Sequence, residues 1–295
     1  MRITLTGATG FLGRQLTEAL RGEGHELRIL SRRIPGEPGF YAWDPPAGPP
    51  PPESLEGAGA VIHLAGEPVA QRWTKAARER IRRSRVDGTR NLVETLSRLA
   101  VRPEVLVSAS AMGYYGSRGD EVLTEDSPAG RGFLPEVCRE WEAAADAAAE
   151  LGIRVVKLRL GVVLGKGGGA LAKMLPAFRA GAGGPLAGGK QWMSWIHVED
   201  AVRLMAWSAG QSSVRGALNA VSPNPIQNKD FTKALGGVLR RPAVFPVPQA
   251  ALQLLFGEMA EILTGSQRAE PRVALAAGFR FRHEDVVESL RSLLY

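Results

Sequence analysis

Near the start of the chain lies the stretch Thr6-Gly7-Ala8-Thr9-Gly10-Phe11-Leu12-Gly13. It joins a short apolar strand, predicted over residues 2–6, to a helix that the spacing of apolar side chains predicts from Phe11 onward. In such a turn the first glycine makes the tight bend, the second lets a pyrophosphate approach the backbone, and the third lets the helix pack on the strand. The N–H groups and the dipole at the helix start attract phosphates. The stretch therefore predicts a dinucleotide-binding turn.

Strands and helices alternate after this turn. Because alternating strands and helices build a parallel sheet with helices on both faces, we expect an α/β fold. The pattern changes past residue 161, where ten glycines lie within 161–189 around one predicted helix. We predict a Rossmann-type doubly wound parallel sheet with a smaller mixed C-terminal substrate domain. The predicted division assigns 1–165 and about 193–225 to the dinucleotide-binding domain, and 166–192 and 226–295 to the smaller domain.

The composition excludes several classes of protein. The chain has 295 residues, of which 44% are hydrophobic and 23% charged, which is ordinary for a globular protein. Its single cysteine, Cys138, excludes an intramolecular disulfide framework and a zinc site built from cysteines. No apolar stretch reaches membrane-spanning length and no secretory start is present, so we expect a cytoplasmic protein without membrane contact. No His, Asp and Glu residues show ligand spacing, so no metal site is predicted.

The net charge of +7 is concentrated in one segment. Residues 72–90 contain eight basic and only two acidic residues, which predicts one basic helix. We favour a solvated helix face; the alternative is a positive wall beside an anionic ligand. Because no nucleic-acid motif accompanies the segment, we expect no nucleic-acid partner.

The end of the second predicted strand indicates which dinucleotide binds. A carboxylate there would bond the ribose of NAD, but the strand ends in Ser31-Arg32-Arg33. Because guanidinium groups suit a 2′-phosphate, we predict NADP(H) as the cofactor.

Four motifs occur in an order that resembles the extended short-chain dehydrogenases/reductases, a superfamily that includes sugar-nucleotide epimerases. They are Gly7-x-x-Gly10-x-x-Gly13, His63-Leu64-Ala65-Gly66, Ser108-Ala109-Ser110 followed by Tyr115-Gly116, and the stretch from Trp195 to Asp200. Further blocks resemble an atypical epimerase-like branch of that superfamily: Leu64 to Glu67, Arg72-Trp73, Ser84-Arg85, Cys138 to Glu142, Gly161 to Gly165, and Gly278-Phe279. The likeness covers nearly the whole chain and implies NADP(H) bound between a Rossmann-type domain and a smaller C-terminal domain.

The turn and the resemblance together predict the cofactor contacts. These are Gly7, Thr9, Gly10, Phe11, Leu12, Gly13, Ser31, Arg32, Arg33, His63, Leu64, Ala65, Gly66 and Ser108. For His63, which lies inside a predicted buried strand, a hydrogen-bonded core histidine is the alternative.

The catalytic pair expected from the resemblance is missing. Those enzymes use a serine or threonine together with Tyr-x-x-x-Lys on a helix, where the lysine lowers the pKa of the tyrosine and holds the nicotinamide ribose. None of the four tyrosines of this chain is followed by lysine at that spacing. When the family's downstream glutamate is aligned with Glu142, Leu134 takes the tyrosine position and Cys138 the lysine position. The serine position falls on Ser110.

We therefore predict a rebuilt catalytic site with Ser110, Tyr115 and Glu67. Tyr115 or Glu67 would move the proton, with Tyr114 as the adjacent option. Loop packing is an equal alternative for both tyrosines, and a surface cap is an equal alternative for Glu67. Arg72 and Arg85 are predicted to hold an anionic group of the substrate. For His197 we favour a structural role.

Two functions are compatible with these residues. The first is an NADP(H)-dependent, epimerase-like oxidoreductase acting on a hydroxyl or carbonyl group of a small molecule. The second is a catalytically silent NADP(H)-binding regulator or sensor, which the missing Tyr-x-x-x-Lys pair motivates. Because related enzymes often pair through helices, a homodimer is a candidate assembly.

Overall fold

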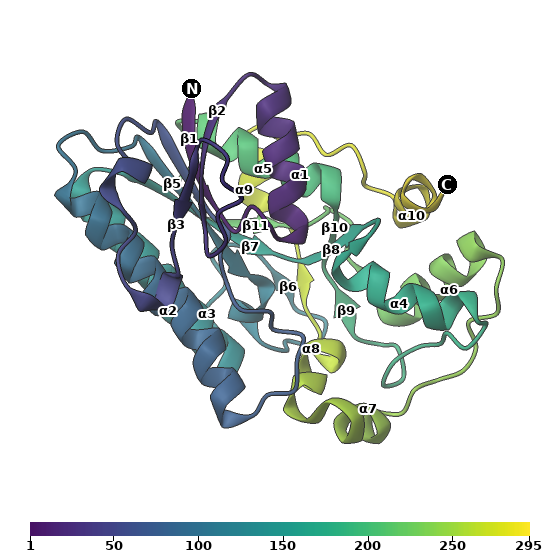
Figure 1. Cartoon of the computed structure of the whole chain (residues 1–295). Helices are drawn as coiled ribbons and strands as arrows, with labels where there is room; N and C mark the ends of the chain where they lie inside the picture. The colour runs from purple at the N-terminus through teal and green to yellow at the C-terminus, as the bar shows by residue number, and fades with distance from the viewer.

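A parallel seven-stranded sheet occupies the centre of the computed structural model, which describes residues 1–295 (Figure 1). Its strands follow the order β3-β2-β1-β4-β5-β7-β11, and every neighbouring pair is parallel. The chain builds outward from β1 to β3 and then returns to β4 on the other side of β1. Ligands bind at such a reversal, beyond the carboxyl ends of the strands. The bounds are β1 (Arg2–Thr6), β2 (Glu26–Ser31), β3 (Phe40–Ala42), β4 (Ala60–His63), β5 (Val105–Ala111), β7 (Arg154–Leu160) and β11 (Gly216–Ala220).

Helices cover both faces of this sheet. Successive strand residues point to opposite faces, so Ile62 packs in one core while its neighbour Val61 packs in the other. The first core lies under α1 (Phe11–Gly22) and α5 (Val198–Gly210), and the second under α2 (Lys75–Arg98) and α3 (Phe133–Asp146). The predicted doubly wound α/β sheet is confirmed.

A third core lies beside the sheet. It joins α4 (Gly169–Arg179), α6 (Asn228–Leu239) and α10 (Val286–Leu294) to the strand pair β8 (Val162–Gly165) and β10 (Trp195–His197). Figure 1 shows this group on the right, with the C-terminus. The remaining elements are β6 (Val122–Leu123), β9 (Trp192–Met193), β12 (Ile226–Gln227), α7 (Gln249–Phe256), α8 (Ala260–Thr264), β13 (Arg268–Ala269) and α9 (Arg272–Ala276), with 3-10 turns between some of them.

The C-terminal segment contributes to two cores. Phe279 and Phe281 pack in the main core on the α1 and α5 face, whereas Leu290 and Leu293 pack in the third core. The boundaries predicted for the smaller domain therefore stay a prediction. No helix is both long and apolar enough to cross a bilayer.

Candidate functional site

The glycine turn lies at the reversal between β1 and β4. Gly7 has φ +73°, and a Cβ at this position would lie 2.7 Å from the carbonyl carbon of Leu64 at the end of β4. A Cβ on Gly13 would lie 2.1 Å from the Gly7 oxygen. These two glycines are therefore required for the close packing of turn, helix and β4. Gly10, by contrast, is exposed.

The start of α1 offers unpaired donors beside this turn. Gly10 caps the helix without a side-chain hydrogen bond, and the first turn holds no acidic residue. The first N–H groups of the helix therefore have no side-chain acceptor, and the exposed Thr9 and Gly10 leave access to them. The residues present fit the diphosphate of a dinucleotide.

The side chain of Phe11 packs against glycines near the end of β8 and does not form part of the phosphate site. A Cβ on Gly168 would lie 2.1 Å from the Phe11 ring, and one on Gly165 would lie 2.3 Å from it. Several glycines after β8 thus make room for this ring. The side chain of Phe11 ties the turn to the third core, and any phosphate contact of this residue comes from its backbone.

The end of β2 carries two exposed cations. The Ser31 Oγ accepts a hydrogen bond from the Arg33 N–H at 3.2 Å, and the guanidinium groups of Arg32 and Arg33 make no hydrogen bond or ion pair within the protein. Because Thr6 pairs with Leu30, these arginines lie next to the glycine turn. Their position and free donors fit a 2′-phosphate.

His63 is held inside the protein. The Thr6 hydroxyl accepts from the N–H groups of Leu64 and Ala65, both at 3.1 Å, so its own proton goes to His63 Nδ1 at 2.7 Å. Burial lowers the pKa of His63 to about 4, and the ring is neutral. The geometry therefore favours the alternative of a core histidine, and the cofactor contact predicted for its side chain is not supported.

The other nitrogen of this ring continues the chain of hydrogen bonds. His63 Nε2 donates to Thr89 Oγ1 at 3.1 Å, and the Thr89 hydroxyl donates to the carbonyl oxygen of Arg85 at 2.6 Å. This chain of hydrogen bonds, which we call the His63–Thr89 relay, runs from Thr6 on β1 through His63 on β4 to α2, and it ends at the carbonyl oxygen of Arg85.

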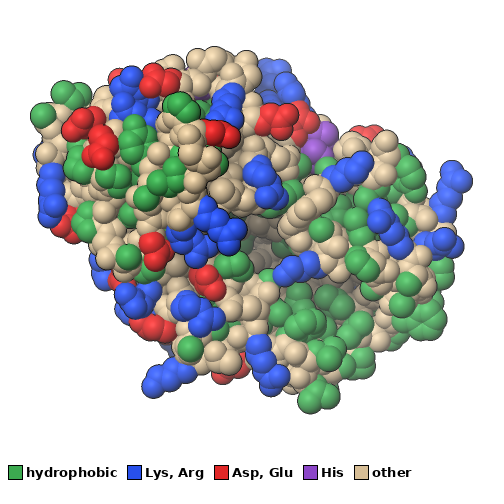
Figure 2. All heavy atoms as spheres, in the orientation of Figure 1, with side chains coloured by type: hydrophobic (Ala, Val, Ile, Leu, Met, Phe, Trp, Pro, Cys, Tyr) green, Lys and Arg blue, Asp and Glu red, His purple; other side chains and the backbone are tan.

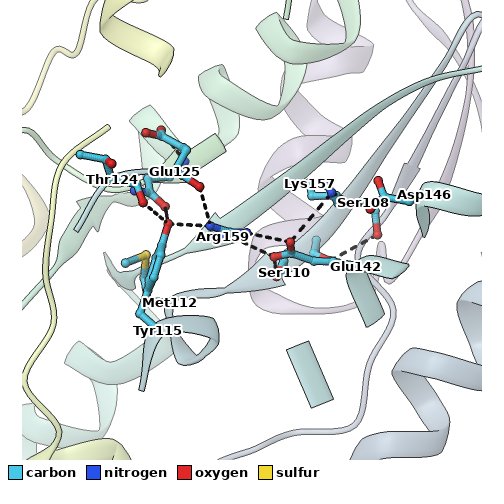
Figure 3. Close-up of polar contacts among 12 residues, drawn as sticks. Ser108, Ser110, Met112, Tyr115, Thr124, Glu125, Glu142, Asp146, Lys157 and Arg159 are labelled. Carbon is cyan, nitrogen blue, oxygen red and sulfur yellow. Dashed lines mark hydrogen bonds and ion pairs between the residues drawn. The ribbon is translucent and has the colours of Figure 1, made fainter. Parts of the chain in front are cut away.

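Ser110 lies at the carboxyl end of β5, but its hydroxyl faces into the protein. It donates to Glu142 Oε1 at 2.7 Å, and Arg159 binds both oxygens of the same carboxylate at 2.8 and 2.9 Å (Figure 3). All three residues are buried, with Ser110 only 2% exposed. Ser108 is also buried, and its Oγ contacts the Ala109 carbonyl at 3.3 Å. In this geometry both serine hydroxyls are buried inside the protein.

Tyr115 belongs to the same buried network. Its side chain has no exposed surface, and its hydroxyl accepts from Arg159 Nη1 at 2.7 Å (Figure 3). The same oxygen lies 2.7 Å from Asn219 Oδ1 and 2.9 Å from the Thr124 carbonyl oxygen. Burial raises the pKa of Tyr115 to about 12. These contacts argue against the predicted proton transfer and give Tyr115 a structural role.

Tyr114 differs from its neighbour. It is half-buried, its ring lies 3.5 Å from the guanidinium carbon of Arg159, and its hydroxyl has no hydrogen bond within the protein. Of the two adjacent tyrosines, Tyr114 is therefore the one whose hydroxyl is available to a ligand.

Helix α3 carries Leu134 and Cys138 at the two positions that the resemblance assigns to tyrosine and lysine. Both lie against Gly113, where a Cβ would be 3.3 Å from Leu134 Cβ and 3.7 Å from Cys138 Sγ. Burial raises the pKa of the Cys138 thiol to about 12, so the thiol is neutral. Neither side chain can exchange a proton at neutral pH.

Glu67 and Arg85 flank the exposed Gly66 beyond β4. The half-buried Glu67 accepts from Gln71 Nε2 at 3.1 Å. Arg85 Nη1 donates to the Glu67 carbonyl oxygen at 2.9 Å. Glu67 and Arg85 thus lie together just after β4, beside the predicted cofactor contacts 64–66. Arg72, which is exposed, lies apart from them beside Gly257.

Most of the basic helix face is paired with carboxylates. Arg82 contacts Glu140 at 2.6 Å, and Arg78 forms an ion pair with Glu258. Further arginines of this segment pair as Arg80–Glu67, Arg83–Asp87 and Arg90–Asp87. Such pairing suits a solvated face. Figure 2 shows Lys and Arg side chains around a hollow near the middle of one face of the molecule.

Two neighbouring side chains and one that is distant in sequence come close enough to hold a metal ion. The candidate ligand atoms of His197, Glu199 and His283 lie within 4.8 Å of one another, which sequence spacing did not predict. However, His197 Nδ1 accepts from the Glu199 N–H, and His283 Nε2 bonds the Glu199 carboxylate at 2.9 Å. The imidazole rings stack with centroids 3.6 Å apart, so their lone pairs do not converge on one point. The hydrogen bond and the ring stack of this cluster join the start of α5 to the C-terminal segment.

Two family models match the chain. The model of the NAD dependent epimerase/dehydratase family matches residues 3–220, and a domain of unknown function (DUF1731) matches residues 247–293. The chloroplastic homolog of epimerase family protein SDR39U1 from Arabidopsis thaliana is 42% identical over 302 residues, which cover 100% of this chain and 87% of that protein.

Two solved structures are also similar. Human epimerase family protein SDR39U1, crystallised with NADPH, superposes with a TM-score of 0.91 at 33% identity, over 99% of both chains. The nucleoside-diphosphate sugar epimerase from Corynebacterium glutamicum gives a TM-score of 0.84 at 35% identity, over 100% of this chain and 58% of that one.

Proposed function

The chain belongs to the NAD dependent epimerase/dehydratase family, and from this premise we propose that it is an NADP(H)-dependent, epimerase-like oxidoreductase. Its substrate would be a small molecule with a hydroxyl or carbonyl group. When bound, the cofactor would supply hydride exchange at the nicotinamide. The protein would supply the binding surface, the orientation of both molecules, and a route for the proton.

One observation carries this proposal: the glycine turn opens toward solvent between unpaired helix donors and two unpaired arginines. The turn suits the diphosphate, and Arg32 and Arg33 suit the 2′-phosphate that distinguishes NADP(H) from NAD(H). The NADPH in the similar human structure supports this choice.

The proton would move through a side chain that is not fully buried in the protein. Glu67 is half-buried beside the exposed Gly66, and Tyr114 has an unbonded hydroxyl. We therefore retain Glu67 and add Tyr114 in place of Tyr115. Arg72 remains a candidate for an anionic group of the substrate. The corynebacterial relative, named a sugar epimerase, supports a nucleoside-diphosphate sugar as the first substrate class to test.

Calorimetric titration of the purified protein with NADPH and NADH tests the cofactor. We expect NADPH to bind at least ten times more tightly. Equal affinities, or no binding of either, would overturn the assignment.

A silent NADP(H)-binding sensor is the second candidate, favoured by the absence of a titrating group at Leu134 and Cys138. The two functions differ in turnover. If NADPH binds but no member of a broad carbonyl and nucleotide-sugar panel oxidises it or is epimerised, the enzyme proposal fails and the sensor is favoured.

Two expectations stay as proposals. A cytoplasmic location can be checked by cell fractionation, and a homodimer by sedimentation.

A further inference from the structure

We propose that Arg85 holds the nicotinamide ribose and supplies the positive charge that the missing lysine supplies in related enzymes. This inference rests on the proposed NADP(H) binding. It replaces the earlier prediction that Arg85 holds an anionic group of the substrate.

The side chain of Arg85 spans the distance between two helices. It starts on α2, and its guanidinium carbon lies 5.2 Å from the ring centroid of Trp141 on α3. Trp141 follows Cys138 by three residues, so both share one face of α3. The charge of Arg85 also acts on Cys138, where it opposes the effect of burial on the pKa of the thiol. A cation on α2 thus lies beside the position where the family carries its lysine.

The same guanidinium also lies close to the end of β4. A Cβ on the exposed Gly66, which follows β4, would lie 3.2 Å from the guanidinium carbon of Arg85. The adjacent residue pair, Leu64 and Ala65, faces Gly7 of the glycine turn. Arg85 therefore lies between the end of β4 and helix α3, at the edge of the predicted cofactor site.

Arg85 has no carboxylate partner. Its only hydrogen bonds run from Nη1 to the carbonyl oxygens of Glu67 and Ile81, at 2.9 and 3.2 Å. Nε and Nη2 make none. Arg159, by comparison, is buried and bound by both oxygens of Glu142. Arg85 is half-buried and its two unused donors are open to solvent, so a ligand can reach them.

A second polar group lies unpaired at this position. The indole Nε1 of Trp141, in the ring that the guanidinium covers, is buried and has no hydrogen-bond partner. Arg85 itself is held in place, because Nη1 is fixed by two carbonyl groups and the His63–Thr89 relay ends on its own carbonyl oxygen. Such preorganisation is typical of a binding group.

The neutral Cys138 is consistent with this assignment. A lysine at this position would bring a second cation next to Arg85 and raise the energy of both. A planar guanidinium with two free donors suits the vicinal hydroxyl groups of a ribose. The charge also favours a substrate oxygen that becomes negative during hydride exchange.

Two ligands test the proposal by calorimetry. NADPH contains the nicotinamide ribose, whereas adenosine 2′,5′-bisphosphate contains only the adenine side of the cofactor. We expect R85M to weaken NADPH binding about 10- to 100-fold and to leave binding of adenosine 2′,5′-bisphosphate unchanged, because a charged hydrogen-bond donor is lost on one side only. R85K, which keeps the charge, should fall between R85M and the wild type.

The matched control is R82M, which removes an exposed arginine from the same helix and should leave both affinities unchanged. Unchanged NADPH binding in R85M, an equal loss for both ligands, or the same loss in R82M would overturn the role of Arg85. If the wild type binds neither ligand, the proposed cofactor fails instead, so the two failures are distinguishable.

Discussion

The glycine turn and the buried network around Arg159 both lie at the carboxyl edge of the sheet, yet they use polar groups in opposite ways. At the turn, helix N–H groups and the guanidiniums of Arg32 and Arg33 have no partner in the protein. In the network, Arg159 is bound by Glu142 and Tyr115, and all three are at most 6% exposed. A binding surface keeps donors unpaired, whereas a structural network satisfies its own groups. Ser110 and Tyr115 belong to the second type.

Breaking the buried ion pair should have the largest effect on stability. E142A leaves the charge of Arg159 buried without a partner, so the free energy of unfolding should fall by about 3–5 kcal/mol in urea titrations. E140A removes the half-buried carboxylate that pairs with the exposed Arg82, and Glu140 lies on the same helix as Glu142. This variant should cost less than about 1 kcal/mol. Equal losses in the two variants would contradict the contrast between network and surface.

A methyl group in the glycine turn should strongly weaken cofactor binding. In G13A the Cβ would lie 2.1 Å from the Gly7 oxygen, so turn and helix must separate. We expect NADPH affinity to fall about 100-fold and stability by about 1–3 kcal/mol. G22A, in the last turn of the same helix, places its Cβ in open space and should change neither. Tight NADPH binding by G13A would refute the role of the turn.

Removing the two exposed cations should affect the choice of cofactor and leave stability intact. The R32A/R33A variant should lose about tenfold in NADPH affinity and little in NADH affinity, because only NADPH carries the 2′-phosphate. Its melting temperature should stay unchanged, since neither side chain has a partner in the protein. R21A, an exposed cation at the other end of α1, serves as the control. A parallel loss for NADH would show that the arginines do not contact the 2′-phosphate.

The adjacent tyrosines should respond differently to loss of the hydroxyl. Y115F removes an acceptor from the buried Arg159 and should cost about 1–3 kcal/mol of stability. Y114F should leave stability within about 0.5 kcal/mol, as is usual away from buried networks, and should lower turnover if Tyr114 moves the proton. Thermal unfolding and turnover, measured on both variants, separate the roles. A stable Y115F with lost turnover would restore the original prediction for Tyr115.

Much of the fold could be predicted because its signals are local. The glycine turn, the alternation of strands and helices, and the arginines after β2 are read from neighbouring residues. Neighbouring residues could not show which polar side chains are free to bind a ligand and which are hydrogen-bonded inside the protein. From the sequence, Tyr115 was a reasonable candidate for proton transfer. In the structure its hydroxyl is hydrogen-bonded to Asn219, which lies 104 residues away in the chain, and to Arg159, which lies 44 residues away. Glu142, on helix α3, likewise binds the hydroxyl of Ser110 on β5 inside the protein.

Residue types at short spacing are enough to predict the parallel α/β architecture and the dinucleotide turn, and to show that a Tyr-x-x-x-Lys pair is absent. The folded chain was needed to show that the side chains of Ser110, His63 and Tyr115 are hydrogen-bonded within the protein, and that Arg85 reaches the position beside Cys138. Burial, hydrogen bonding and nearby charge set the chemistry of a polar side chain, and the neighbours that provide them come from distant parts of the chain.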